Sequence, residues 1–255
     1  VRHVHGVIEP GQSWEQAVVP HGLPGTGGAT LEVSAVPPLN LEERLGSLIR
    51  YPHGCAEQTT SAAFPQAVLP GLVHMDEKAA RQAESNVRAG LERLRQFQIP
   101  SGGFVYWPGA PGEADGWVTN YIGHFLVEAE RRGFTAPGAM RAQWALFQRN
   151  RAQAWAPASG TVGTLEQAYR LFTLALAGEP ELGAMNRLRE SELLPAARWT
   201  LAAAYFLAGV KDAAQALAGG AGIDPGPGLS EGTYPSPLRD QAMILLGAAV
   251  QGDYA

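Results

Sequence analysis

The stretch YPHGCAEQTTSAAFPQ, residues 51–66, is the most informative part of this sequence for its fold and chemistry. It contains Cys55, the only cysteine among 255 residues, and Gln58 three positions later. The residue before a proline is biased away from helical backbone, so Tyr51 and Pro52 predict the end of one element and Cys55 the start of a helix. Residues three apart on a helical turn share a face, which predicts that the Cys55 thiol and the Gln58 carboxamide meet.

A thiol beside a carboxamide predicts a specific chemistry. If the two groups condense with loss of ammonia, the product is an internal thioester. A thiolate, whose parent thiol has a pKa of about 8.5, leaves more readily than an amine, so the Gln58 acyl carbon becomes a stored electrophile. Gly54 leaves room for a tight turn, and unpaired N–H groups at the helix start can stabilise the oxyanion that forms during attack.

Composition narrows the classes of function. At 27.0 kDa the chain is long enough to bury a large core. With 24 acidic and 19 basic residues, and arginines scattered among other residues, nucleic acid is not an expected partner. A single cysteine cannot form an internal disulfide or a cysteine-built zinc site, and we expect neither a metal nor a cofactor.

The ends of the chain and its hydropathy predict a soluble fragment. No run approaches the roughly 18 apolar residues of a membrane span. The start, VRHVHGVIEPG, has neither an initiator methionine nor a signal-peptide core. We therefore expect the chain to be a piece of a longer protein.

The first 38 residues favour β structure. Apolar and polar residues alternate in HVHGVIE (3–9), WEQAVVP (14–20) and ATLEVSAV (29–36). Two or three strands do not make an independent sheet. Residues 1–38 are therefore predicted to belong to a neighbouring β-domain, or to form a ribbon that packs on the rest of the chain.

From residue 40 onward leucine, alanine and arginine recur at helical spacing. Asn40 is an expected N-cap for a helix over 41–51, with Glu43 in the capping-box position. Further helices are predicted at 55–69, 76–98, 117–132, 137–151, 163–177, 193–208, 210–218 and 237–250. Short links predict antiparallel helical hairpins, stacked as a solenoid or closed into a ring. The absence of a strict repeat counts against the open solenoid, and SGGF (101–104) resembles the turns of α/α-toroid proteins.

The residues around Cys55 carry a family resemblance. GCAEQ (54–58) looks like the Gly-Cys-x-Glu-Gln thioester signature of the alpha-2-macroglobulin and complement superfamily. The longer run LNLEERLGSLIRYPHGCAEQTTSAAFP (39–65) resembles the bacterial alpha-2-macroglobulins. The segments GGFVYWPG (102–109), DGWVTNYIGHFLVEA (115–129) and SPLRDQAMILLGA (236–248) fit the same domain. The resemblance implies an α/α toroid with a thioester over 39–255, and an adjoining CUB-type domain to which 1–38 would belong.

The resemblance also implies a function. Members of that family trap proteinases: cleavage of a bait segment elsewhere exposes the thioester, which acylates a nucleophile on the attacker. Cys55 would then be the thiol partner and Gln58 the acyl donor to a lysine of a target endopeptidase. The expected partners are such endopeptidases and the neighbouring domains of the full macroglobulin. The expected location is the periplasm, with a possible anchor at the inner membrane, and the expected role is that of an inhibitor and not of an enzyme.

A stored electrophile needs a cover against water. The resemblance places an aromatic shield at Tyr51, just before the turn, with Pro52 beside it. Phe104, Tyr106 and Trp107 are further candidates, and ordinary core or turn packing is the alternative for each of them. Glu57 matches the acidic position of the motif, with no chemical role assigned.

The histidines bear on which nucleophile is chosen. Complement-type members carry a downstream histidine that directs the thioester toward hydroxyl groups. The equivalent position here falls between Ala156 and Glu166, where there is none, and this predicts amine-directed chemistry. His53 lies two residues before Cys55; helical neighbours at that spacing do not face each other, so it is interpreted as a loop residue and not as a general base.

Three alternatives stay open. A toroid enzyme such as a terpene cyclase or a prenyltransferase-like protein needs an Asp-rich or zinc site, and the aspartates here are scattered singly. A cysteine hydrolase would use a Cys55 thiolate at a helix N-terminus, but a convincing histidine and a third orienting group are lacking. In a helical interaction module, Cys55 would be only a small buried side chain.

Overall fold

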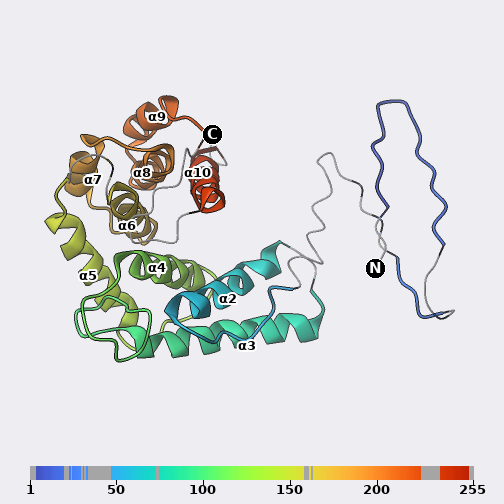
Figure 1. Cartoon of the computed structure of the whole chain (residues 1–255), viewed down its shortest axis with the longest axis horizontal. Helices are drawn as coiled ribbons and strands as arrows, with labels where there is room; N and C mark the ends of the chain where they lie inside the picture. The colour runs from blue at the N-terminus through green and yellow to red at the C-terminus, as the bar shows by residue number, and fades with distance from the viewer. Residues whose placement is uncertain are drawn as a thin grey trace. The chain divides into compact units, whose positions relative to one another are not determined.

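The structure is a computed structural model that describes residues 4–19, 23, 25–29, 31, 33, 47–72, 75–157, 161, 163–224 and 236–252 (Figure 1). The chain divides into two compact units, Val1–Leu41 and Glu42–Ala255. The boundary between the units falls close to the expected change from β-type to helical sequence at residues 38–40.

The first unit does not show the expected strands. Its described residues, including 4–9 and 14–19, lie in turns and irregular backbone. Two turns are closed by hydrogen bonds, from Gln12 N to Glu9 O (2.9 Å) and from Thr26 N to Leu23 O (3.1 Å). The expected third strand and the helix over 41–51 fall largely outside the described residues, although residues 47 and 48 form a turn.

The second unit is helical. Its elements are α2 (Ala56–Val68), η1 (Leu69–Gly71), α3 (Glu77–Leu94), η2 (Arg95–Phe97), α4 (Gly116–Arg131), α5 (Met140–Ala154), α6 (Thr164–Leu176), α7 (Leu182–Arg189), α8 (Pro195–Leu207), α9 (Lys211–Gly219) and α10 (Pro237–Gly252). The expected ranges overlap all of the α-helices in the described residues except α7. That helix has only eight residues and no side-chain cap, and so gives a weak periodic signal.

The helices form an inner row and an outer set. The inner helices α2, α4, α6, α8 and α10 contact one another in succession, while α3, α5, α7 and α9 pack against them from outside (Figure 1). This is the arrangement of an α/α toroid built from helical hairpins, as expected. Two buried apolar clusters fill it, one centred on α2 to α5 and the other on α6 to α10.

The SGGF turn follows α3 and η2 in the chain and leads to a segment that contacts the start of α2. Gly102 has φ +97°, and a Cβ built on it would lie 2.3 Å from the carbonyl oxygen of Gln143. Only glycine fits such a backbone so close to another chain segment. Past the turn, the carbonyl of Tyr106 accepts a hydrogen bond from the N–H of Ala56 (3.0 Å), the first residue of α2. The turn therefore satisfies an otherwise unpaired group at the helix end that carries Cys55.

Candidate functional site at the start of α2

Cys55 and Gln58 meet at the N-terminus of α2. Cys55 is the N-cap residue, with extended backbone (φ −71°, ψ 176°). The Gln58 N–H donates to Sγ of Cys55 (3.5 Å), and the Cys55 N–H donates to Oε1 of Gln58 (3.2 Å). This reciprocal pair is a capping box in which cysteine takes the place of the usual serine or threonine. The motif spacing thus brings the sulfur and the carboxamide onto one helical turn.

Gly54 makes this approach possible. Its φ is +93°, and a Cβ built on it would lie only 2.1 Å from Oε1 of Gln58. Any side chain at this position would be strained by the backbone and would also collide with the carboxamide. Glycine is therefore required here both for the turn and for the space.

The buried side-chain amide of Gln66 holds the backbone at Arg50, which leads into the turn at Gly54. Nε2 of Gln66 donates to the carbonyl of Arg50 (2.7 Å), and Nδ2 of Asn86 on α3 donates to Oε1 of Gln66 (2.8 Å). Both amide side chains are about 1% exposed. This pair is not predicted from the sequence, where its only signal is two polar residues among the apolar positions of α2 and α3.

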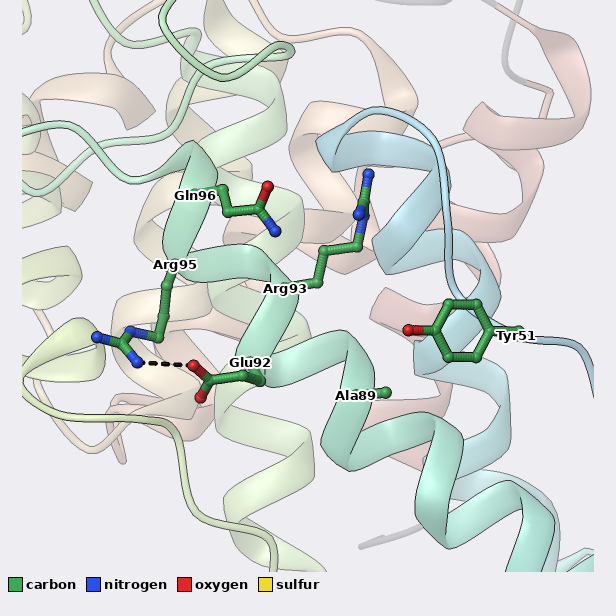
Figure 2. Close-up of a pocket in the computed structure, with 6 residues that line it drawn as sticks. All are labelled: Tyr51, Ala89, Glu92, Arg93, Arg95 and Gln96. Atoms are coloured by element: carbon green, nitrogen blue, oxygen red, sulfur yellow. Dashed lines mark hydrogen bonds and ion pairs between the residues drawn. The ribbon is translucent and has the colours of Figure 1, made fainter.

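The proposed shielding residues do not cover Gln58, which is exposed. Tyr51 is 61% exposed and borders a groove along α3 (Figure 2), and Trp107 is 58% exposed. Phe104 is fully buried in the core cluster, where Thr119 holds its backbone. Tyr106 is half-buried and contributes its carbonyl to α2. In the described part of the chain, Cys55 is buried while Gln58 remains open to solvent.

Pro52 and Glu57 are the other two residues of the predicted site, and neither covers Gln58. Pro52 is buried, close to where α2 and α3 cross. Glu57 accepts a hydrogen bond from Ser61 Oγ (2.5 Å), which in turn lies 3.2 Å from the hydroxyl of Tyr121. Burial raises the pKa of Tyr121, and the nearby Glu57 carboxylate adds to the rise. Glu57 therefore faces a hollow between α2, α4, α6 and α10, and not the Cys55 sulfur.

His53 lies where a loop residue is expected. Its ring is exposed, and Nδ1 lies 3.0 Å from the carbonyl oxygen of Tyr51. Of the segment between Ala156 and Glu166, residues 158–160 and 162 fall outside the described part. Glu166 itself forms an ion pair with Arg170 (2.6 Å).

His124 is half-buried between α2 and α6. Its Nδ1 lies 3.0 Å from the Tyr169 hydroxyl, and aromatic rings of α2 and α6 pack edge-on against it. Burial lowers the pKa of His124 to about 4; Glu128 opposes this shift, and Arg132 and Arg131 add to it. His124 is therefore neutral at pH 7 and structural in role.

We expect His124 to make the fold sensitive to acid. Between pH 6.5 and about 4 the unfolded chain binds a proton that the folded chain does not, so the free energy of unfolding should fall as the pH falls, by about 3 kcal/mol in total. Denaturant titrations at several pH values, compared with His124→Gln, measure this. Carboxylates contribute equally to both proteins, so identical pH dependence in the two would contradict the assignment.

The described residues contain neither a cluster of metal ligands nor a membrane-spanning helix. No group of three or more His, Cys, Asp or Glu side chains among them could hold a metal ion. No helix in the same part of the chain is long and apolar enough to cross a membrane.

Comparison with known proteins assigns the chain to a family. Residues 28–155 match the family model described as the A-macroglobulin TED domain. The chain belongs to the A-macroglobulin TED-domain family. The family is one of proteinase inhibitors and not of enzymes, which argues against the cyclase and hydrolase alternatives.

The TED domain has bacterial relatives. It is 36% identical to the alpha-2-macroglobulin of Escherichia coli K12 over 140 residues, covering 51% of this chain and 8% of the relative. It is 26% identical to that of Xylella fastidiosa Temecula1 over 260 residues, covering 95% and 16%. The chain therefore spans less than a fifth of the length of these relatives.

Solved structures show the same fold. Native E. coli alpha-2-macroglobulin superposes with a TM-score of 0.68 at 24% identity, covering 84% of this chain and 14% of the other. Salmonella alpha-2-macroglobulin reacted with methylamine superposes with a TM-score of 0.67 at 25% identity, covering 85% and 15%. The mainly α TED architecture expected from the sequence is confirmed.

Proposed function

We propose that this TED domain is the thioester domain of a bacterial alpha-2-macroglobulin-like, broad-spectrum endopeptidase inhibitor, with Cys55 and Gln58 joined as an internal thioester. The observation that carries the proposal is the reciprocal N-cap, in which Sγ and the carboxamide lie on one turn beside a glycine that nothing larger can replace. The Salmonella relative, described as reacted with methylamine, supports the same chemistry in the family.

The proposed capture step is a single acyl transfer. A lysine amine of the proteinase attacks the Gln58 acyl carbon, forming a C–N bond as the C–S bond breaks. The proton lost by the amine is taken up by the departing Cys55 thiolate, which the N-terminus of α2 stabilises until then. The target remains attached to Gln58 through an amide. Because nothing restores the thioester, each molecule acts once and is an inhibitor.

The exposure of Gln58 supports a role for neighbouring domains. An exposed thioester would be lost to water, and the described residues of this chain leave Gln58 uncovered. We propose that adjoining domains of the full macroglobulin cover it together with the exposed Tyr51, until bait cleavage elsewhere removes the cover. A periplasmic location, with a possible inner-membrane anchor, is part of the same proposal and rests on the family.

Mass spectrometry of the complete, never-denatured protein tests the function. We expect the peptide with Cys55 and Gln58 to be lighter by one ammonia. Methylamine should add to Gln58 and release one titratable thiol, while glycerol should react much more slowly. Cys55→Ser should abolish the thiol release and reduce methylamine uptake to background, because an alkoxide is a far poorer leaving group than a thiolate.

A different result would favour the helical interaction module. In that alternative, Sγ of Cys55 is simply the N-cap acceptor of α2, a role its bond with the Gln58 N–H already provides. The folded protein would then carry a free thiol and an unmodified Gln58, and methylamine would leave its mass unchanged.

A further inference from the structure

We propose that Arg93 on α3 is a positioning residue for the acyl transfer, because it orients and polarises the Gly54–Cys55 peptide that supplies the oxyanion donor. This inference rests on the proposed thioester function. The sequence alone predicts no role for Arg93, because the run ERLRQ (92–96) has the composition of an ordinary charged helix end.

The Arg93 guanidinium contacts the residues that flank the Cys55–Gln58 pair on both sides. Nη2 of Arg93 donates to the Gly54 carbonyl (2.9 Å), and Nε donates to Oγ1 of Thr59 (3.3 Å). Gly54 directly precedes Cys55, and Thr59 directly follows Gln58. One side chain from a different helix thus ties together both ends of the reactive segment.

The Gly54 carbonyl and the Cys55 N–H belong to the same peptide group. In a trans peptide these two groups point in opposite directions. By holding the carbonyl oxygen of Gly54, Arg93 fixes the direction of the Cys55 N–H, which donates to Oε1 of Gln58 (3.2 Å). The backbone donor is therefore aimed at the carboxamide oxygen before any reaction begins.

That oxygen is the atom on which charge develops. In the thioester, Oε1 of Gln58 corresponds to the acyl oxygen, and it becomes an oxyanion when an amine attacks. A charge-assisted hydrogen bond on the carbonyl side strengthens the N–H on the other side of the same peptide. The same donor would serve thioester formation, where the Cys55 sulfur bonds to the Gln58 acyl carbon, the thiol proton passes to the leaving nitrogen, and the C–N bond breaks to release ammonia. Preorganised donors of this kind give large rate effects because they need no rearrangement during reaction.

Close helix packing places Arg93 at the turn. A Cβ built on Gly90 would lie 2.6 Å from Cβ of Ala63, so α3 approaches α2 closely there. Arg93 follows three residues later on the same face, and its guanidinium lies 5.8 Å from the centre of the Phe97 ring. Figure 2 shows Arg93 reaching toward α2, whereas Arg95 points away and pairs with Glu92 (2.6 Å).

The test compares variants of the complete protein. Arg93→Gln should react with methylamine at least about tenfold more slowly, measured as thiol release per intact thioester, or emerge folded with a free thiol and unmodified Gln58. Arg93→Lys should lie between, because an ammonium keeps the charge but cannot hold both acceptors in the same geometry. Arg95→Gln, which removes an exposed charge two residues away, should leave both thioester content and rate unchanged.

A stability control separates positioning from general weakening of α3. Val87→Ala removes buried methyl groups from α3, so it should lower the melting temperature without slowing methylamine. If Val87→Ala slowed the reaction as much as Arg93→Gln, the effect would follow stability and the inference would be overturned. Thioester content and rate for Arg93→Gln within about twofold of the unchanged protein would also overturn it.

Two further results would also decide the role of Arg93. If Arg93→Gln does not fold, Arg93→Lys decides, and a rate within twofold of the unchanged protein contradicts the inference. If the unchanged protein itself releases no thiol with methylamine, the proposed function fails, and the inference fails with it. A reactive unchanged protein together with an unaffected Arg93→Gln refutes the inference alone.

Discussion

Replacing Gly54 with alanine should remove the reactive thioester and lower the free energy of unfolding by about 2 kcal/mol. The added Cβ would meet Oε1 of Gln58 at 2.1 Å, and the backbone at φ +93° is strained for any residue with a side chain. The turn can relieve both only by moving the carboxamide away from Sγ of Cys55. Because the thioester requires these two groups in contact, methylamine uptake should fall to background.

A matched variant isolates the contact with Gln58. Gly133 has a similar φ of +84°, but among the described residues no atom lies within 4 Å of a Cβ built on it. Gly133→Ala should therefore show the backbone strain alone, with a normal thioester. Denaturant unfolding and methylamine labelling of both variants measure the difference, and full labelling of Gly54→Ala would contradict the geometry proposed for the site.

The second large effect is expected in the core. Arg170 is 2% exposed, and its guanidinium donates to Oε1 of Gln148 (3.2 Å), to Oε1 of Gln167 and to Glu166 (2.6 Å). Gln148 in turn donates to Oδ1 of Asn120 (2.5 Å), so the network joins α4, α5 and α6. Burial lowers the pKa of Arg170, and Glu166 opposes that shift.

Arg170→Met should destabilise the domain by about 3 kcal/mol. The methionine fills much of the volume, but it leaves buried amide oxygens without donors and Glu166 without its partner. Arg81→Met is the control: its pair with Glu77 is largely exposed (71% and 88%), and its loss should cost at most about 0.5 kcal/mol. Denaturant titration of both variants measures the costs, and equal values would mean that the buried network contributes no more than a surface pair.

The sequence by itself determined the contact between Cys55 and Gln58 and most of the helices. A cysteine and a glutamine three apart after glycine suffice to specify the contact, because one helical turn brings those positions together and the capping box closes on itself. Apolar spacing likewise predicted every α-helix that the structure describes except α7, whose eight residues are too few for a clear period. These are local properties, and local spacing is what a sequence displays directly.

Only the tertiary structure decided what surrounds the turn. Arg93 and Arg95 are two residues apart in sequence, yet only Arg93 reaches Gly54, because the close crossing at Gly90 and Ala63 sets which face of α3 meets α2. The same is true of Gln66, which holds the carbonyl of Arg50, and of Phe104, which packs in the core and leaves Gln58 uncovered. Such contacts join segments that are distant along the chain, and the helix crossings that create them depend on the packing of the whole core.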